Sequence, residues 1–257
     1  MDAFTLNELL IAFGVVLLAG LVHGTFGIGF PMVATPVLAA FSDVKTAILL
    51  TLAPNIAVNI WSLLHGGQWL DSVRAHWPVA VWMLGGSVIG TWLLSQMDPN
   101  PFRLLLALTL ALYLLSHHLR QINWQWVRNH PRRSGIGFGL LGGFLGGTVN
   151  VGGPPLLIYF MELRLAPVVW VQALNLCFLV GKTAQVSTFA ILGLLSAPLL
   201  LWSIPIGVVA LIGLRSGMWL RAHIPAQRYI HWLRALLWGL CALLLLQFLR
   251  EFVAASS

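Results

Sequence analysis

One lysine lies in the middle of a long apolar segment, where a charged side chain is costly. Lys182 is central in a predicted helix at 167–192 and belongs to the polar stripe Gly181-Lys-Thr-Ala-Gln185-Val-Ser187. An ammonium group at this depth of a bilayer is a candidate for function, because it lies too far from the helix ends to reach water easily. We predict that Lys182 attracts a small anion; a structural bond to a backbone carbonyl is the alternative.

Asparagines within the apolar segments are the second group of candidates. Asn55 and Asn59 are four residues apart in a predicted helix at 44–65, so they share one helix face. They also lie near the position that corresponds to Lys182 when the two halves of the chain are matched. Amide N–H groups there would donate hydrogen bonds to an anion, and Asn175 is a similar candidate. The alternative for each asparagine is a hydrogen bond between helices.

Two segments, at 24–41 and 147–163, are apolar but interrupted by glycine and proline, and neither is comfortably long enough to cross a bilayer. A helix breaks at membrane depth only where protein shields the break or where it faces a wet cavity. The short helix after each break would begin with free N–H groups and the positive end of its dipole, which suit an anion. We predict that an anion binds at Gly24, Thr25, Gly27 and Gly29 of the first break, and at Gly147, Thr148, Asn150, Gly152 and Gly153 of the second. The alternative is that these glycines only allow helices to pack closely.

Three further ionisable residues lie near the apolar segments. His23 stands beside the first break and Glu162 is an acid embedded in apolar sequence, so both are candidates for coupling transport to protons. The alternatives are a structural histidine with satisfied hydrogen bonds, and a local ion pair between Glu162 and Arg164 at the membrane interface. Arg215 lies near the end of its predicted helix. Its side chain either extends to the membrane interface or has a functional role, and the sequence favours neither interpretation.

The composition places these residues in a membrane. The chain has 257 residues, of which 59% are hydrophobic and only 8% are charged, too few charges to cover a soluble domain. Apolar runs of 18 residues or more are long enough to cross about 30 Å of hydrocarbon. We predict an all-α polytopic membrane protein with about eight spans, at 5–23, 44–65, 74–95, 101–119, 135–148, 167–192, 198–220 and 229–250.

Several classes of function are not expected. The 14 Lys and Arg give a formal charge of +7, but they are spread along the loops, which argues against nucleic acid as a partner. The eight histidines are scattered, so we expect neither a metal site nor a cofactor. The chain lacks His-Glu-x-x-His and Gly-x-Ser-x-Gly motifs and has no paired carboxylates within a span, so it is not expected to be an enzyme. The expected partners are the lipid bilayer and a small anion, and a homo-oligomer is left open.

A basic segment at 120–134 divides the chain into two related halves, 1–119 and 135–257. Residues 20–31 match 143–154 in glycine, threonine and proline, and Pro78, Gly86 and Gly90 match Pro205, Gly213 and Gly217. If each half is a broken helical hairpin followed by three crossings, the halves are inverted repeats with a binding site between them near the midplane. The basic linker is then cytoplasmic under the positive-inside rule.

A first helix that ends in a Gly-x-Gly break followed by proline, repeated after a basic linker, resembles the sulfite exporter TauE/SafE family, also called toluene sulfonate uptake permeases. The resemblance extends from about residue 6 to 250 and includes the loop Gly66-Gly-Gln-Trp-Leu-Asp71. It implies a transporter, expected to be an exporter, of small sulfur-containing anions such as sulfite or organosulfonates in the bacterial inner membrane. The alternatives are a transporter of a different small anion and a membrane scaffold or assembly protein.

Overall fold

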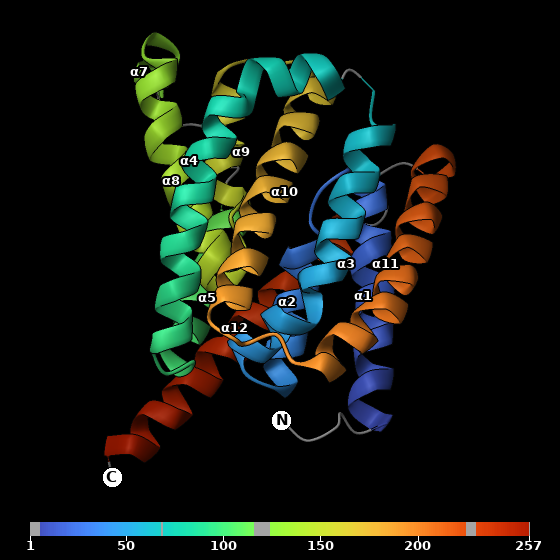
Figure 1. The fold of residues 1–257 in the computed structure, drawn as a ribbon, viewed down its shortest axis with the longest axis vertical. Helices are drawn as coiled ribbons and strands as arrows, with labels where there is room; N and C mark the ends of the chain where they lie inside the picture. The colour runs from blue at the N-terminus through green and yellow to red at the C-terminus, as the bar shows by residue number, and fades with distance from the viewer. Residues whose placement is uncertain (1–5, 68, 116–123, 225–229, 257) are drawn as a thin grey trace.

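The computed structural model describes residues 6–67, 69–115, 124–224 and 230–256, and its regular structure in these ranges is helical. The first half contains α1 (Leu6–Phe26), α2 (Phe30–Phe41), α3 (Val44–His65), α4 (Trp69–Gln96) and α5 (Asn100–Leu114). The linker and the second half contain α7 (Gln125–Asn129), α8 (Pro131–Val149), α9 (Gly153–Glu162), α10 (Pro167–Ile191), α11 (Ala197–His223) and α12 (Ile230–Ser256). The predicted all-helical class is therefore confirmed (Figure 1).

The observed helix bounds follow the predicted ones closely where glycine, proline or a capping side chain marks an end. Helix α3 has the predicted bounds, and it begins after Asp43, whose carboxylate accepts a hydrogen bond from the backbone N–H of Thr46 at 2.9 Å. Helix α8 begins at Pro131, four residues before the predicted start and inside the predicted linker. The linker also contains the short helix α7, which was not predicted. Residues 120–123 of the linker lie outside the described residues.

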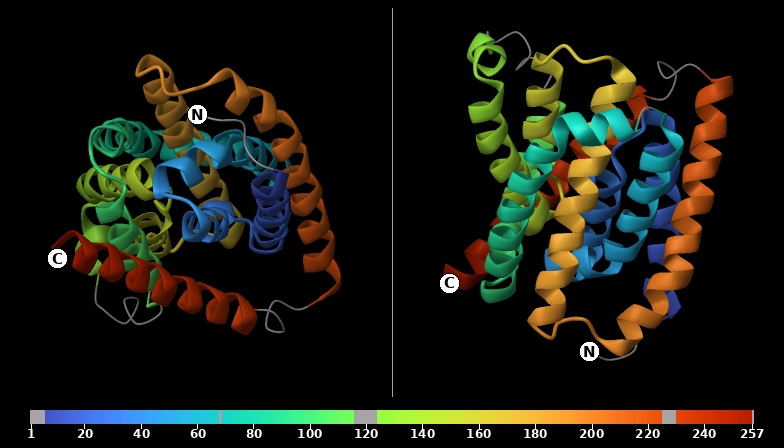
Figure 2. Two further views of the ribbon diagram at one scale, coloured as in Figure 1. Left: turned by 90° about the horizontal axis from the view of Figure 1, so that it is seen from below. Right: turned by 45° about the horizontal axis from the view of Figure 1, so that its top comes forward.

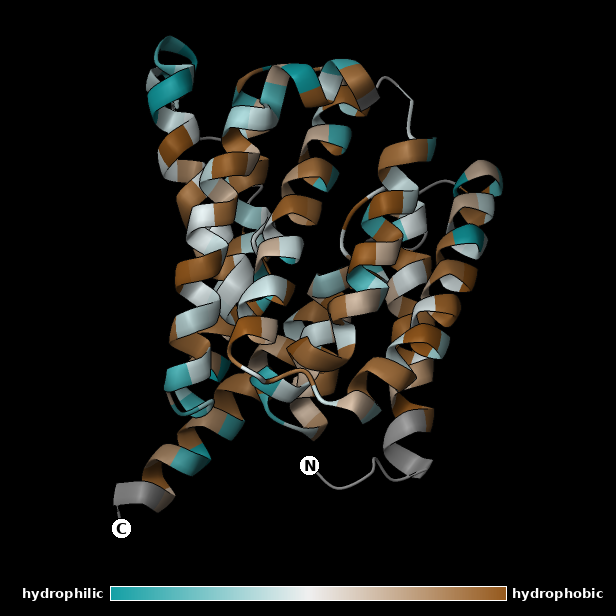
Figure 3. Ribbon diagram, in the orientation of Figure 1, coloured by the Kyte–Doolittle hydropathy of each residue, from teal (hydrophilic) through white to brown (hydrophobic). Residues whose placement is uncertain are grey.

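Five helices of the described chain are long and apolar enough to cross a membrane, against about eight predicted spans. They are Val44–His65, Leu70–Gln96, Pro167–Ile191, Ala197–His223 and His231–Ala254. The apolar parts described for α1 and α5 are shorter, Leu10–Phe26 and Asn100–Leu114, so these crossings stay predictions together with α8. Hydrophobic residues dominate the long helices in Figure 3, and large apolar side chains on their outer faces are exposed, as expected for contact with lipid.

The helices pack in two groups that each contain members of both halves. In the first bundle, α1 and α3 pack against α11, and α2 packs against α1 and α3. In the second bundle, α8 and α10 pack against α4, and α9 packs against α8 and α10. The two bundles are separated in Figure 1 and meet where α3 faces α10. Helix α5 packs against α12, which runs along one side of the molecule in Figure 2. Each half therefore contributes one long helix to the other bundle.

Glycines make the closest helix contacts in both bundles. A Cβ atom on Gly24 of α1 would collide with the carbonyl oxygen of Leu214 in α11, and one on Gly217 would collide with that of Leu21. In the second bundle a Cβ on Gly143 would collide with the carbonyl oxygen of Met83. The glycines in such contacts are Gly20, Gly24, Gly213 and Gly217 in one bundle, and Gly86, Gly90, Gly143 and Gly147 in the other. The glycines that match between the halves thus let α1 approach α11 and α8 approach α4.

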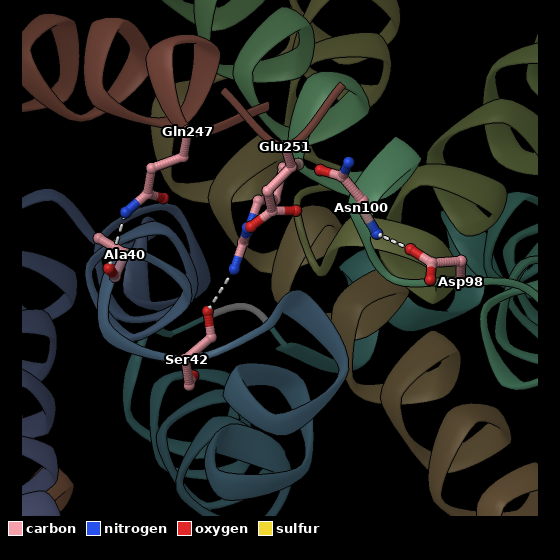
Figure 4. A network of polar contacts seen from close by, with 7 residues as sticks. Ala40, Ser42, Asp98, Asn100, Gln247 and Glu251 are labelled. Atoms are coloured by element: carbon pink, nitrogen blue, oxygen red, sulfur yellow. Dashed lines mark hydrogen bonds and ion pairs between the residues drawn. The ribbon is translucent and has the colours of Figure 1, made fainter. Parts of the chain in front are cut away.

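Polar contacts attach α12 and α5 to the end of α2 (Figure 4). The amide of Gln247 donates to the carbonyl oxygen of Ala40 at 2.9 Å, and the guanidinium of Arg103 donates to that of Ser42, also at 2.9 Å. Arg103 also forms an ion pair with Glu251. The last carbonyl groups of the broken hairpin are therefore bonded by side chains from both halves of the chain.

Candidate functional site

The two backbone breaks lie next to each other. In the first, Gly27 and Gly29 have φ angles of 79° and 110°, which glycine adopts without strain. In the second, Asn150 has a φ of 64°, the left-handed conformation that asparagine tolerates better than most residues. A Cβ atom on Gly153 would collide with the methyl group of Met32, so the first turns of α9 and α2 are in contact.

A small cavity lies between the two bundles at these breaks. Its volume is about 20 Å³, enough for about one water molecule. Its polar lining comes from three helices and the second break, whereas the first turn of α2 contributes Pro31. The lining residues are Pro31, Asn55, Met83, Ser87, Gly146, Asn150, Gly152, Phe178, Gly181 and Lys182. The structure therefore brings together four of the predicted site residues: Asn55, Asn150, Gly152 and Lys182.

Lys182 is the charged group of this cavity. Its side chain is buried, with the residue 6% exposed, and its ammonium group donates to the amide oxygens of Asn150 and Gln185. The two ion pairs among the described residues are Arg103–Glu251 and Arg128–Glu162, so no described carboxylate neutralises Lys182. A buried charge that only neutral dipoles compensate is costly. The cavity is thus an electrostatically favourable place for an anion.

Asn150 is the centre of the hydrogen-bond network around the cavity. Its amide nitrogen donates to the hydroxyl groups of Thr35 at 2.6 Å and Thr51 at 3.1 Å. Its amide oxygen accepts from Lys182 and, at 3.3 Å, from the amide of Asn55. The second break is therefore bonded to α2, α3 and α10 through a single side chain, and this network joins the two bundles.

The charge balance of this network can be tested at Asn150. An Asn150→Asp variant places a carboxylate next to the Lys182 ammonium with almost no change in shape. We expect this internal ion pair to compete with any anion in the cavity and to weaken anion binding at least about tenfold, while the protein stays folded. Calorimetric titration of the purified variant with sulfite measures the loss of affinity. Binding of sulfite with wild-type affinity would contradict a role for the positive charge.

Several polar groups near the cavity were not singled out from the sequence. The hydroxyl of Ser87 donates to the carbonyl oxygen of Gly181 at 2.6 Å, which links α4 to α10 beside Lys182. Gln185 accepts from Lys182 and donates to the carbonyl oxygen of Gly147 at 2.8 Å, so it connects the lysine to the end of α8. The only sequence signal for Thr35, Thr51 and Ser87 is a hydroxyl group within an apolar helix.

Other predicted site residues have structural partners. The hydroxyl groups of Thr25 and Thr148 donate within their own helices, to Val22 and Phe144, both at 2.8 Å. Asn59 donates to the backbone and side-chain oxygens of Asn55 at 2.7 Å, which orients the Asn55 amide. Asn175 donates to the carbonyl oxygen of Gly27 at 3.0 Å and so supports the first break. Gly24 and Gly147 lie in the close helix contacts described above.

The first turns of the short helices offer fewer N–H groups than the sequence predicts. The backbone N–H of Phe30, the first residue of α2, donates to Nδ1 of His23 at 3.4 Å, and that of Met32 donates to the carbonyl oxygen of Gly29 at 3.1 Å. Proline has no N–H, and it occupies the second position of α2 and the second and third positions of α9. An anion at the cavity would therefore bind mainly to side chains.

The remaining ionisable candidates lie away from the cavity. Glu162 forms an ion pair with Arg128 of the linker at 2.9 Å. The predicted ion pair between Glu162 and Arg164 is therefore wrong. The path of the linker brings Arg128 to the end of α9, which sequence spacing alone does not reveal. Arg215 is exposed on α11, eight residues before the helix ends at His223. The described residues contain no group of three or more His, Cys, Asp or Glu that could hold a metal ion.

These features define a polytopic helical membrane protein with two broken helices beside a buried cation. The family model of the sulfite exporter TauE/SafE matches residues 12–248, nearly the whole chain, and the protein belongs to this family. No curated protein and no solved structure matches the chain. Membership of this family indicates a membrane transporter of sulfur-containing anions.

Proposed function

We propose that the protein exports a small sulfur oxyanion, such as sulfite or an organosulfonate, across the bacterial inner membrane and binds it at Lys182. The observation that carries this proposal is the buried ammonium group without a carboxylate partner among the described residues. An ammonium group has three N–H bonds, and two of them are directed to Asn150 and Gln185. The third is available for an oxyanion, whose negative charge then compensates that of the lysine.

The amide groups around Lys182 complete the proposed site. Asn55 and Asn150 each carry N–H donors, and exchange of their present partners for the anion needs only a rotation of the side chains. The cavity has room for only about one water molecule, so an anion enters only when the two bundles move apart slightly. We therefore assign the present structure to a nearly closed state of the transport cycle.

The arrangement of the helices supports a transport mechanism based on inverted repeats. Helix α1 begins at the lower end of Figure 1, whereas the matching helix α8 begins at the upper end, next to α7. Each bundle contains close glycine contacts, and the Asn150 network joins the bundles beside the cavity. In this proposal the two bundles move as units about the Lys182 site, and the basic linker is on the cytoplasmic side.

Counterflow in proteoliposomes tests the proposed function. Vesicles loaded with unlabelled sulfite and diluted into radiolabelled sulfite are expected to accumulate label transiently. We expect thiosulfate and short organosulfonates to compete for the site, and vesicles without protein provide the control. No accumulation with any member of this panel would contradict the proposal.

Coupling to protons is proposed at His23, at the first break. Its Nε2 contacts the hydroxyl of Ser62 at 3.0 Å, and its Nδ1 accepts from Phe30, an arrangement that fits a neutral ring with the proton on Nε2. A second proton on Nδ1 would remove the acceptor for Phe30 and loosen the start of α2. We expect His23→Gln to keep counterflow but to lose accumulation of sulfite driven by a pH gradient. Accumulation at the wild-type level in this variant would exclude the histidine as the coupling group.

A further inference from the structure

A second, larger cavity lies at the end of the molecule where α1, α3 and α11 end and α10 begins. Its volume is about 240 Å³, far more than that of the Lys182 cavity. Its polar lining includes His23, Ser62, His65, Gln172 and Arg221, and apolar side chains such as Trp170 form the rest of the wall. We name it the Arg221 vestibule. A cavity of this size accommodates a hydrated oxyanion or a short organosulfonate.

Arg221 gives the vestibule its charge. The residue lies in the last turn of α11, and its Nη1 atom is 4.0 Å from the position that a Cβ on Gly27 would take. Its guanidinium group forms no ion pair with a carboxylate in the described part of the chain, and no Asp or Glu is among the residues that line the vestibule. Guanidinium groups bind oxyanions through two parallel hydrogen bonds. The vestibule therefore offers an unneutralised cation next to the first break.

Gln172 adds an independent sign of a ligand. The residue is 2% exposed, and its amide nitrogen donates to the carbonyl oxygen of Ser62 at 3.1 Å, but its Oε1 atom is buried without a hydrogen-bond partner. The amide lies directly against Gly66, because a Cβ atom there would collide with the amide nitrogen. Buried polar atoms are rarely left unpaired in native proteins. A protonated oxygen or the hydration water of an anion in the vestibule satisfies this atom.

A short series of contacts leads from the vestibule to the Lys182 cavity, and it begins at His23. The ring of His23 lines the vestibule and accepts a hydrogen bond from Phe30, and the next residue, Pro31, lines the Lys182 cavity. A movement of the first turn of α2 would therefore join the two spaces.

We infer that the Arg221 vestibule is a second anion site, in which a sulfur oxyanion binds to the guanidinium of Arg221 before it reaches Lys182. This inference rests on the proposed function and assigns the vestibule as the first binding step on one side of the membrane. The apolar wall accommodates the carbon chain of an organosulfonate, and the polar groups bind its sulfonate. A bare sulfite ion uses only the polar part of the site.

Equilibrium binding of radiolabelled sulfite to the purified full-length protein tests this inference. Wild-type protein is expected to bind two anions per chain, and Arg221→Gln to weaken one of the two sites at least about tenfold. Arg221→Lys keeps the charge and should restore part of the affinity. The matched control is Arg215→Gln on the same helix, since Arg215 lines other surface cavities and its loss should leave both sites intact.

The Lys182→Gln variant separates the two proposals. It is expected to remove the other site and to leave the Arg221 site unchanged. If Arg221→Gln binds sulfite as wild-type protein does while Lys182→Gln loses one site, the vestibule inference is wrong and the central site stands. If Lys182→Gln has no effect while Arg221→Gln loses a site, the vestibule stands and the central site is wrong. If wild-type protein binds no sulfite, both the central-site proposal and the vestibule inference are wrong.

Discussion

Lys182→Ala is expected to reduce sulfite counterflow at least about a hundredfold, the largest effect of any single substitution at the site. Lys182 is the only charged residue that lines the central cavity in the described chain, so no neighbour replaces its ammonium group. In the alanine variant an anion in the cavity would face only neutral groups, and a buried charge without a charged partner is strongly unfavourable. The initial rate of label uptake in proteoliposomes, normalised to the amount of protein inserted, measures the loss.

The stability of a second variant, Lys182→Met, distinguishes a functional lysine from a structural one. Removal of a buried charge without a carboxylate partner costs little stability, so we expect the unfolding midpoint of Lys182→Met, which keeps the apolar stem, to be unchanged or raised. The matched control is Thr183→Ala, because Thr183 is the next residue along α10 but is exposed. It should transport at the wild-type rate. A strongly unfolded Lys182→Met variant would instead support a structural lysine.

Gly24→Ala is expected to destabilise the protein by about 3 kcal/mol or more. Its Cβ atom would collide with the backbone of α11 at Leu214, and the neighbouring Gly217 leaves no side chain that could move aside. The helices α1 and α11 must therefore separate, and the first bundle loses its closest contact. Thermal unfolding of the purified variant in detergent should show a midpoint lowered by on the order of 10 °C.

Gly14→Ala provides the control on the same helix. Nothing lies within 4 Å of the position of its Cβ atom, so this substitution should leave stability unchanged or raise it by up to about 1 kcal/mol. Equal unfolding midpoints for the two variants would contradict the close packing of α1 against α11.

The sequence predicts most of the helices because glycine, proline and charge interrupt otherwise continuous apolar runs. Helix α3 has the predicted bounds and α10 ends one residue before its predicted end. The breaks are located correctly for the same reason, since Gly27, Gly29 and Asn150 occupy the left-handed positions. The sequence does not predict how the two halves pack against each other, because a run of apolar residues does not reveal which neighbouring helix it contacts.

The residues that surround the central cavity were partly predictable. A lysine within a span is unusual enough to be identified alone, and Asn55 and Asn150 follow from their place on a helix face and at a break. Thr35 and Thr51 were missed, because threonine in an apolar helix most often bonds to its own backbone, as Thr51 also does with Ala47 at 2.8 Å.

The repeated glycines show how two interpretations of one pattern can be separated. Gly24 and Gly147 match between the halves and were predicted to bind an anion, with close packing as the alternative. Both lie where a Cβ atom would collide with the backbone of the neighbouring helix, Gly24 against α11 and Gly147 against α4. Close packing therefore explains why both positions are glycine; Gly24 also lines the Arg221 vestibule, and Gly152 lines the central cavity.

The most direct test of the central claim is the position of a bound oxyanion in a crystal of the protein grown with selenite. Selenite has the shape and charge of sulfite, and selenium is located by its anomalous scattering. We predict an anomalous peak in the central cavity, with a selenite oxygen about 3 Å from Nζ of Lys182 and the amides of Asn55 and Asn150 turned toward it. Selenite bound only outside the central cavity, with the Lys182 cavity still closed around Asn150, would contradict the account.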